Sequence, residues 1–306
     1  MRFLLIDPFI DKNVVKSIFA MESQLPSLGL LYIGSVLEKE GHDVDLIDFC
    51  AEKFTEEKLK KKLKDTDVVG ITVRTHGLKS VMKLCRIIKK LKPEITIIIG
   101  GPHCTLEPIK ALKDTKADIL VEGDGEFVIK EITKALQNKK PLDNIPGVHF
   151  WEKNKIKNGP PAKIIMDLDK IPFPARHLVK KYKYGYFEGG FSLNKGLVTS
   201  LTISRGCPYH CRFCVDNAIT KKYRARSPEN IIEEIRQIEK DYDFIYIMDD
   251  NFFVDVKKTE RFLDLLIKER FNLKFSAAGI RIDMANKRLF KKMKYYRSWK
   301  FCVIDW

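Results

Sequence analysis

Apolar, β-branched runs alternate with stretches of helical periodicity along the first 136 residues. The run Ile97-Ile98-Ile99 is apolar at consecutive positions, which is typical of a parallel strand buried on both faces. This alternation predicts five strands at Phe3–Asp7, Val44–Asp48, Val68–Val73, Ile95–Gly100 and Ile119–Glu122, and five helices at Leu28–Glu40, Glu56–Lys64, Lys79–Leu91, Leu106–Lys113 and Glu126–Leu136. Five such βα units predict a doubly wound α/β sheet.

The carboxyl ends of these predicted strands are polar and rich in glycine. In doubly wound sheets, ligands bind beyond these strand ends, and glycine lets a bulky ligand approach the backbone. No G-x-G-x-x-G motif opens the first helix, which disfavours dinucleotide binding. The candidate ligand-binding residues are Thr72, Thr75, Gly100, Gly101, Pro102, His103, Glu122, Gly123, Gly125 and Glu126.

Residues 137–195 are richer in proline, glycine and lysine and predict a connector between two domains, 1–136 and 196–306. Two apolar stretches, Gly147–Trp151 and Lys163–Met166, predict a small hairpin. The prolines of the following segment, Leu168–Arg176, force an extended path.

The second half again alternates strand and helix. The predicted strands are Leu197–Ser204, Phe244–Met248, Lys274–Gly279 and Phe301–Ile304, and the predicted helices are Glu229–Lys240, Lys257–Arg270 and Leu289–Tyr295. Pro228 suits a helix N-terminus.

Three cysteines with the spacing C-x3-C-x2-C, Cys207, Cys211 and Cys214, follow the first of these strands. Soft thiolates select zinc, copper(I) or iron–sulfur clusters. A [4Fe–4S] cluster takes four ligands, so three cysteines would leave one iron open to a ligand that is not protein. A zinc site that includes His210 is the alternative, although structural zinc sites usually show two separated ligand pairs.

The composition fits a two-domain globular protein that has no membrane span. The chain has 306 residues and seven cysteines, an odd number that fits a reducing compartment, so we expect a cytoplasmic protein. The net charge of +15 could indicate an anionic partner. Many lysines fall within helical patterns, as in Lys60–Lys62, and no RNA-binding motif is found, which makes nucleic acid an improbable partner.

The cysteine motif, with an aromatic residue, Phe213, before the third cysteine, resembles that of the radical S-adenosylmethionine (SAM) enzymes. The first 136 residues resemble the cobalamin-binding domain of the B12-dependent members, through Pro26–Leu30 and the glycine-rich strand ends. The D-x-H-x-x-G motif of other cobalamin proteins is absent, so we expect no histidine on cobalt. The resemblance implies a flavodoxin-like, cobalamin-binding domain followed by a radical SAM partial (βα) barrel.

The resemblance also implies cofactors and site residues. Cys207, Cys211 and Cys214 would hold a [4Fe–4S] cluster, whose open iron binds SAM. Phe213, Asp249, Asp250, Asn251 and Arg281 stand where the family contacts SAM or the cluster, and a helix cap or a surface ion pair is the alternative for the acids and for Arg281. Complete relatives cleave SAM with one electron from a donor and perform radical carbon chemistry, often methyl transfer.

The predicted barrel is about two βα units shorter than in the family. We expect a truncated gene product. A second chain that completes the barrel and a short natural variant are the alternatives, and the substrate cannot be deduced. Two rival functions stay open. One is a cofactor-binding remnant without turnover. The other is a tRNA methylthiotransferase, which would need Cys50, Cys85 and Cys104 to hold a second cluster.

Overall fold

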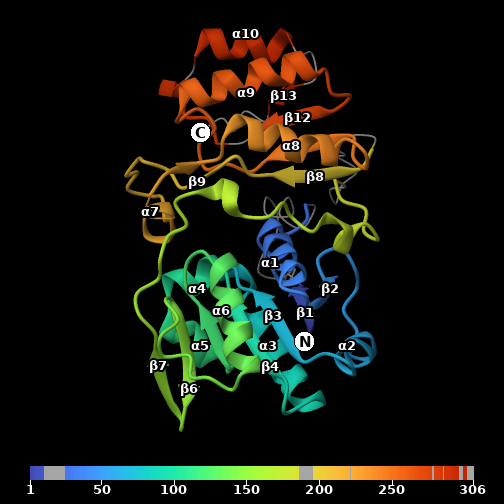
Figure 1. Ribbon diagram of the computed structural model, residues 1–306, viewed down its shortest axis with the longest axis vertical. Coiled ribbons are helices and arrows are strands. Elements are labelled where there is room, and N and C mark those ends of the chain that lie inside the picture. The colour runs from blue at the N-terminus through green and yellow to red at the C-terminus, as the bar shows by residue number, and fades with distance from the viewer. Residues whose placement is uncertain are drawn as a thin grey trace. The chain divides into compact units, whose positions relative to one another are not determined.

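The computed structural model describes residues 1–9, 25–185, 196–220, 222–277, 279–284, 286–295 and 299–301 (Figure 1). The chain divides into two compact units. The first unit is Met1–Ile165 with Ile171–Tyr182, and the second is Met166–Lys170 with Lys183–Trp306. In the described part of the chain, no helix combines the length and the apolar character that crossing a bilayer requires.

The first unit is a seven-stranded sheet in the order β2-β1-β3-β4-β5-β6-β7. Strands β1 to β5 are parallel and have the flavodoxin-like order 2-1-3-4-5, as the alternating pattern predicted. The strands are β1 (Arg2–Asp7), β2 (Asp43–Asp48), β3 (Val68–Thr72), β4 (Thr96–Gly100), β5 (Ile119–Val121), β6 (Val148–Glu152) and β7 (Lys155–Asn158), and the helices are α1 (Leu28–Lys39), α2 (Glu56–Leu63), α3 (Leu78–Leu91), α4 (Pro102–Leu106), α5 (Pro108–Thr115) and α6 (Glu126–Gln137).

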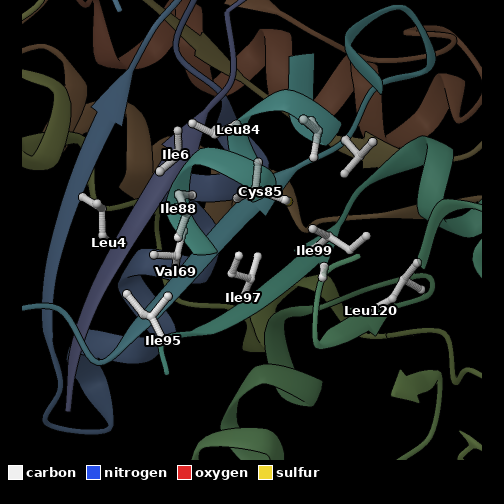
Figure 2. Close-up of a cluster of buried hydrophobic side chains, with 14 of the residues drawn as sticks. Leu4, Ile6, Val69, Leu84, Cys85, Ile88, Ile95, Ile97, Ile99 and Leu120 are labelled. Carbon is white, nitrogen blue, oxygen red and sulfur yellow. The ribbon is translucent and has the colours of Figure 1, made fainter. Parts of the chain in front are cut away.

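One hydrophobic cluster of this unit lies between the sheet and the helices on one face, and alternate strand residues such as Leu5 and Ile98 are buried outside that cluster. Figure 2 shows Cys85 and Ile88 of α3 among side chains from β1, β3, β4 and β5, such as Ile97. Cys85 and Ile97 are at most 1% exposed. Burial on this scale explains why the strand sequences are continuously apolar.

The predicted helix Leu106–Lys113 corresponds to α5, which begins and ends two residues later, and a separate short helix, α4, precedes it. Glu107 between them has φ −135° and ψ 57°, outside the helical range. Pro108 has no backbone N–H to continue α4, and it is the first residue of α5 instead.

The hairpin predicted in the connector exists, but its second strand was predicted at the wrong residues. Strand β6 pairs antiparallel with β7, Lys155–Asn158, and not with Lys163–Met166. Lys153 and Asn154 both have positive φ, 47° and 63°, as a two-residue hairpin turn requires. Because β6 also pairs antiparallel with β5, the hairpin extends the first sheet.

The second unit contains a four-stranded parallel sheet in the order β13-β12-β11-β8. The strands are β8 (Val198–Leu201), β9 (Ser204–Arg205), β10 (Arg224–Ala225), β11 (Phe244–Ile247), β12 (Lys274–Ala277) and β13 (Trp299–Phe301), and the helices are α7 (Asp216–Ile219), α8 (Pro228–Ile238), α9 (Val256–Glu269) and α10 (Lys287–Tyr295). The last strand begins two residues earlier than predicted, and the remainder of the predicted Phe301–Ile304 lies outside the described residues.

These parallel βα units have a hydrophobic core of their own, with residues from β8, β11 and β12 packed against α8, α9 and α10. The mixed α/β fold class predicted for both units is confirmed.

Candidate cluster and cofactor sites

The three cysteines of the motif lie on one loop of the second unit. Strand β9 pairs antiparallel with β10, so Ser204 and Arg205 face Ala225 and Arg224 and close the base of the loop. Within the loop, the backbone N–H of Cys214 donates to the carbonyl of Cys211 at 3.0 Å. The three cysteines therefore lie on one loop with a paired base.

The exposure of these thiols separates them from Cys85 and Cys104, which are buried, whereas Cys50 is half-buried like two of them. Cys207 and Cys211 are half-buried and Cys214 is exposed. Cys85, in contrast, is buried, and burial raises its thiol pKa to about 12. Thiolates, not thiols, bind metals, and burial in apolar surroundings disfavours the thiolate of Cys85. The loop cysteines therefore have the chemistry of ligands, and Cys85 has that of a core residue.

The donor set of the loop suits an iron–sulfur cluster. It offers three soft thiolates from one short segment, and each thiolate of a [4Fe–4S] cluster binds a different iron. The residues present therefore fit a cluster.

Two adjacent carboxylates at the end of β11 hold the strand that leads to the cysteine loop. Oδ1 of Asp249 accepts from the N–H of Ile203 at 2.9 Å, and its Oδ2 accepts from the Ser204 hydroxyl at 2.5 Å. Oδ2 of Asp250 accepts from the N–H of Gly206 at 3.0 Å. Burial raises the pKa of Asp249 to about 7. Both oxygens of Asp249 thus serve the protein itself.

Asn251 follows these acids and is only 1% exposed. Its Oδ1 accepts from the N–H of Phe253 at 3.3 Å. Its Nδ2 is buried and has no hydrogen-bond partner among the described residues. A buried donor without a partner is costly, so Nδ2 is a candidate to donate to a bound ligand.

Arg281, beyond β12, lies against the cysteine loop. Its Nη1 donates to Sγ of Cys211 at 3.4 Å, and its guanidinium carbon lies 3.9 Å from the centroid of the Tyr209 ring. Its Nε and Nη2 donate to the two carboxylate oxygens of Asp283 at 3.0 and 2.7 Å. Phe213, predicted beside these residues as a cofactor contact, is 88% exposed.

In the first unit, the strand ends bring several predicted residues together. Oγ1 of Thr75 lies 3.2 Å from Nδ1 of His103, which is 7% exposed. Nε2 of His103 has no hydrogen-bond partner among the described residues. Desolvation by burial lowers the His103 pKa and favours the neutral ring. Thr75 follows the carboxyl end of β3, and His103 follows the carboxyl end of β4.

The contacts of Gly101, which has φ +112°, explain why glycine stands at this position. A Cβ there would lie 3.0 Å from Oγ1 of Thr72 and 3.1 Å from N and O of Val73. The glycine therefore permits a close approach within the protein, between the ends of β3 and β4. Gly100 and Pro102 flank it on β4 and α4.

The end of β5 forms a second group. Oε2 of Glu122 lies 3.1 Å from Nε2 of His149 on β6. The N–H of Gly123 donates to Oγ1 of Thr105 at 3.0 Å. Gly125 precedes α6, and Glu126, its first residue, is buried. These residues lie near the carboxyl edge of the sheet, where Glu122 and Gly123 contact protein groups.

The comparisons with known proteins match both units. Residues 18–133 match the B12 binding domain family, and residues 201–303 match the radical SAM superfamily. The chain belongs to the B12-binding radical SAM proteins. This family assignment confirms the predicted resemblance, and the predicted cofactor classes, cobalamin, a [4Fe–4S] cluster and SAM, are those of the two matched families and their solved relatives.

Two relatives illustrate the match in sequence. The chain is 31% identical over 300 residues to the uncharacterized methyltransferase PH0819 of Pyrococcus horikoshii, covering 96% of this chain and 63% of that protein. It is 26% identical to cytidylyl-2-hydroxyethylphosphonate methyltransferase of Streptomyces wedmorensis, covering 75% of this chain and 52% of that protein. The chain therefore spans between half and two thirds of these B12-binding radical SAM relatives.

Two solved structures share the fold. The cobalamin-dependent SAM radical enzyme OxsB, with aqua-cobalamin and SAM bound, matches with a TM-score of 0.74 at 18% identity, over 96% of this chain and 42% of that one. The radical SAM methyltransferase TsrM from Kitasatospora setae, with tryptophan and a SAM analogue, matches with a TM-score of 0.70 at 16% identity, over 90% and 54%.

The methylthiotransferase alternative finds no support in the first unit. Cys85 and Cys104 are buried in its hydrophobic core, and Sγ of Cys50 donates to the carbonyl of Pro8 at 3.2 Å. Among the described residues, these three cysteines are not gathered as a ligand set.

Several residues that shape the sites were missed by sequence reasoning. Ser204 is hydrogen-bonded to Asp249, and Tyr209 stacks under Arg281. In the first unit, Arg74 donates to both carboxylate oxygens of Asp7, at 2.9 and 3.0 Å. The ion pair between Arg74 and Asp7 could have been predicted from the sequence. Both residues stand at the carboxyl ends of strands that flank the topological switch point.

Proposed function

We propose that this chain binds a [4Fe–4S] cluster, SAM and cobalamin, and that it is part of a cobalamin-dependent radical SAM methyltransferase. The observation that carries the proposal is the loop closed by β9 and β10, which presents Cys207, Cys211 and Cys214 while Cys85 is buried. The family's curated relatives are mostly methyltransferases, which supports the reaction class.

The second unit would hold the cluster and SAM. Cys207, Cys211 and Cys214 would ligate the cluster, and Nδ2 of Asn251 would donate to SAM at the open iron. The bound cofactors supply one-electron reduction, radical formation and methyl transfer, whereas the protein binds and orients them. Asp250 and Arg281 would line this site, and exposed Phe213 would cover the cluster from solvent.

The first unit would hold cobalamin at the carboxyl ends of its parallel strands. Thr72, Thr75 and His103 stand beside the end of β3 and the start of α4, and Glu122, Gly123, Gly125 and Glu126 stand beside the end of β5. Neutral His103 suits a hydrogen-bonding role toward the cofactor, with no histidine bound to cobalt.

The proposal also names partners. Reduction of the cluster requires a one-electron donor. An oxygen-sensitive cluster and free thiols suit the reducing cytoplasm. The positive charge is distributed over helices that pair many of their lysines with acids, for example Lys292 with Asp264 and Glu260, which argues against a dedicated nucleic-acid surface.

Anaerobic reconstitution with iron and sulfide tests the proposal. We expect close to four irons per chain, with thiolate-to-iron absorption. Replacing Cys207, Cys211 or Cys214 by Ala should abolish this absorption. Cys50→Ala is the matched control and should leave the iron content unchanged. Stoichiometric zinc without iron uptake would contradict the proposal.

A further inference from the structure

The cysteine loop is contacted by a charged side chain that is not a cluster ligand. Arg281 lies 70 positions along the chain from Cys211, and its Nη1 donates to the Cys211 sulfur at 3.4 Å. This contact aims a cationic donor at a sulfur of the motif. It joins the segment after β12 to the loop after β9.

The orientation of Arg281 is fixed from two sides. Asp283 accepts from Nε and Nη2 with both carboxylate oxygens, which holds the guanidinium plane as a fork. The Tyr209 ring lies 3.9 Å from the guanidinium carbon, a cation–π stacking distance. Since these contacts use Nε and Nη2, Nη1 is left to point at Cys211.

A second contact joins the same two segments. The Tyr209 hydroxyl donates to the Met284 sulfur at 3.0 Å. Residues 281–284 therefore hold the loop at Tyr209 and at Cys211, on either side of His210. An ordinary surface ion pair between Arg281 and Asp283 would need neither contact.

We propose that Arg281 is a positioning residue that sets the reduction potential of the cluster through its hydrogen bond to the Cys211 sulfur. Reduction adds negative charge to the cluster and its thiolates. A cationic donor at a ligand sulfur stabilises that charge and raises the potential, as hydrogen bonds to cluster sulfurs do in general. This inference rests on the proposed function, since it presumes a cluster on Cys207, Cys211 and Cys214.

Replacement of Arg281 tests the inference in the reconstituted full chain. Arg281→Met keeps a long apolar stem and removes the charge and the donor, whereas Arg281→Lys keeps the charge without the planar fork. The matched control is Arg261→Met, which removes an exposed arginine whose ion pair with Glu229, at 3.0 Å, joins α9 to α8. Iron content and the midpoint of an EPR-monitored redox titration are measured for each.

We expect wild type and all three variants to hold close to four irons. Arg281→Met should make the cluster about tenfold harder to reduce, which is about 59 mV for a one-electron couple. The midpoint of Arg281→Lys should lie between those of wild type and Arg281→Met, and the midpoint of Arg261→Met should match that of wild type. An unchanged midpoint in iron-replete Arg281→Met would overturn the inference. If Arg281→Met loses iron and Arg281→Lys restores the iron content, a midpoint of Arg281→Lys below that of wild type would support the inference. The iron content of wild type reports separately on the proposed function.

Discussion

At the residue scale, Asp249 shows how a buried carboxylate can hold the strand that leads into the cysteine loop. Its two oxygens accept from Ile203 and Ser204, the residues that lead into the cysteine loop. Burial of this group disfavours its charged form and raises its pKa to about 7. Its contribution to folding therefore depends on pH.

The substitution Asp249→Asn should remove that dependence. An unfolded aspartate loses its proton near pH 3.9, so between about pH 4 and pH 7 the folded state binds more protons than the unfolded state. The contribution of Asp249 to stability is fully present below about pH 4 and is lost as the pH rises through 7. We expect the free energy of unfolding of wild type to fall, relative to Asp249→Asn, by up to about 1.4 kcal/mol per pH unit in that window.

Urea denaturation from pH 4 to pH 8 measures this difference. A Trp151→Phe background leaves Trp299 and Trp306, both in the second unit, as the fluorescent reporters. Parallel pH profiles for the two proteins would contradict the assignment.

For the second unit, the sequence predicted candidate site residues but not their contacts. The C-x3-C-x2-C spacing predicted the thiol loop, because all three cysteines are local. The hydrogen bond from Arg281 to Cys211 joins residues 70 positions apart and depends on the order of β8, β11 and β12 in the sheet. Asp249 was predicted as a cofactor contact, and only the fold shows that its oxygens are already used by Ile203 and Ser204.

At the element scale, the ends of β3 and β4 approach closely at Gly101. The N–H of Val73 donates to the Gly100 carbonyl at 2.7 Å, and the N–H of His103 donates to the Val73 carbonyl at 3.1 Å. These bonds tie the start of α4, and with it His103, to the end of β3. The positive φ of Gly101 and the absence of a Cβ make this arrangement accessible.

Gly101→Ala should therefore destabilise the first unit by ~1–3 kcal/mol, through backbone strain and contact with Thr72 and Val73. Gly29→Ala is the matched control, because Gly29 lies in α1 and a Cβ there meets nothing within 4 Å. We expect that control to be neutral or slightly stabilising. Thermal unfolding, monitored by circular dichroism, compares Gly101→Ala with Gly29→Ala. Equal melting temperatures for the two variants would refute the argument.

The elements were predicted best where periodicity was long and worst at turns. Strands β1 to β5 follow from apolar runs, since burial on both faces leaves a clear pattern. The hairpin partner was missed because its strand, Lys155–Asn158, is polar and mostly exposed, and its signal lies in the turn at Lys153 and Asn154. The break between α4 and α5 was marked by Pro108 and was open to prediction.

At the scale of the whole molecule, each unit has its own hydrophobic core, and the first unit extends beyond the predicted domain end at residue 136. Strand β6 covers the edge of β5, from Ile119 to Val121. The segment Ile171–Tyr182 packs on the same unit. The N–H of Ala175 donates to the Leu31 carbonyl at 3.0 Å, and Lys181 donates to the Leu46 carbonyl at 2.7 Å.

A fragment of residues 1–182 should consequently fold cooperatively and bind cobalamin, whereas residues 1–136 should lose stability, because β5 becomes an open edge. The cob(II)alamin EPR spectrum of the longer fragment should show no histidine nitrogen on cobalt, and His103→Gln should leave that spectrum unchanged. Equal stability of the two fragments, or a histidine-ligated cobalt, would contradict this expectation.

The hairpin also forms one edge of the first sheet in the described part of the chain. Strand β7 is the last strand in the order of the first sheet, and it presents Lys155 and Lys157 at exposed positions. Open strand edges promote intermolecular β-pairing, and lysines on the edge oppose it. Two approaching copies would bring these like charges together, in a chain that already carries a net charge of +15. The lysines of the outermost strand therefore oppose aggregation by charge repulsion, and this repulsion weakens as salt screens their charges.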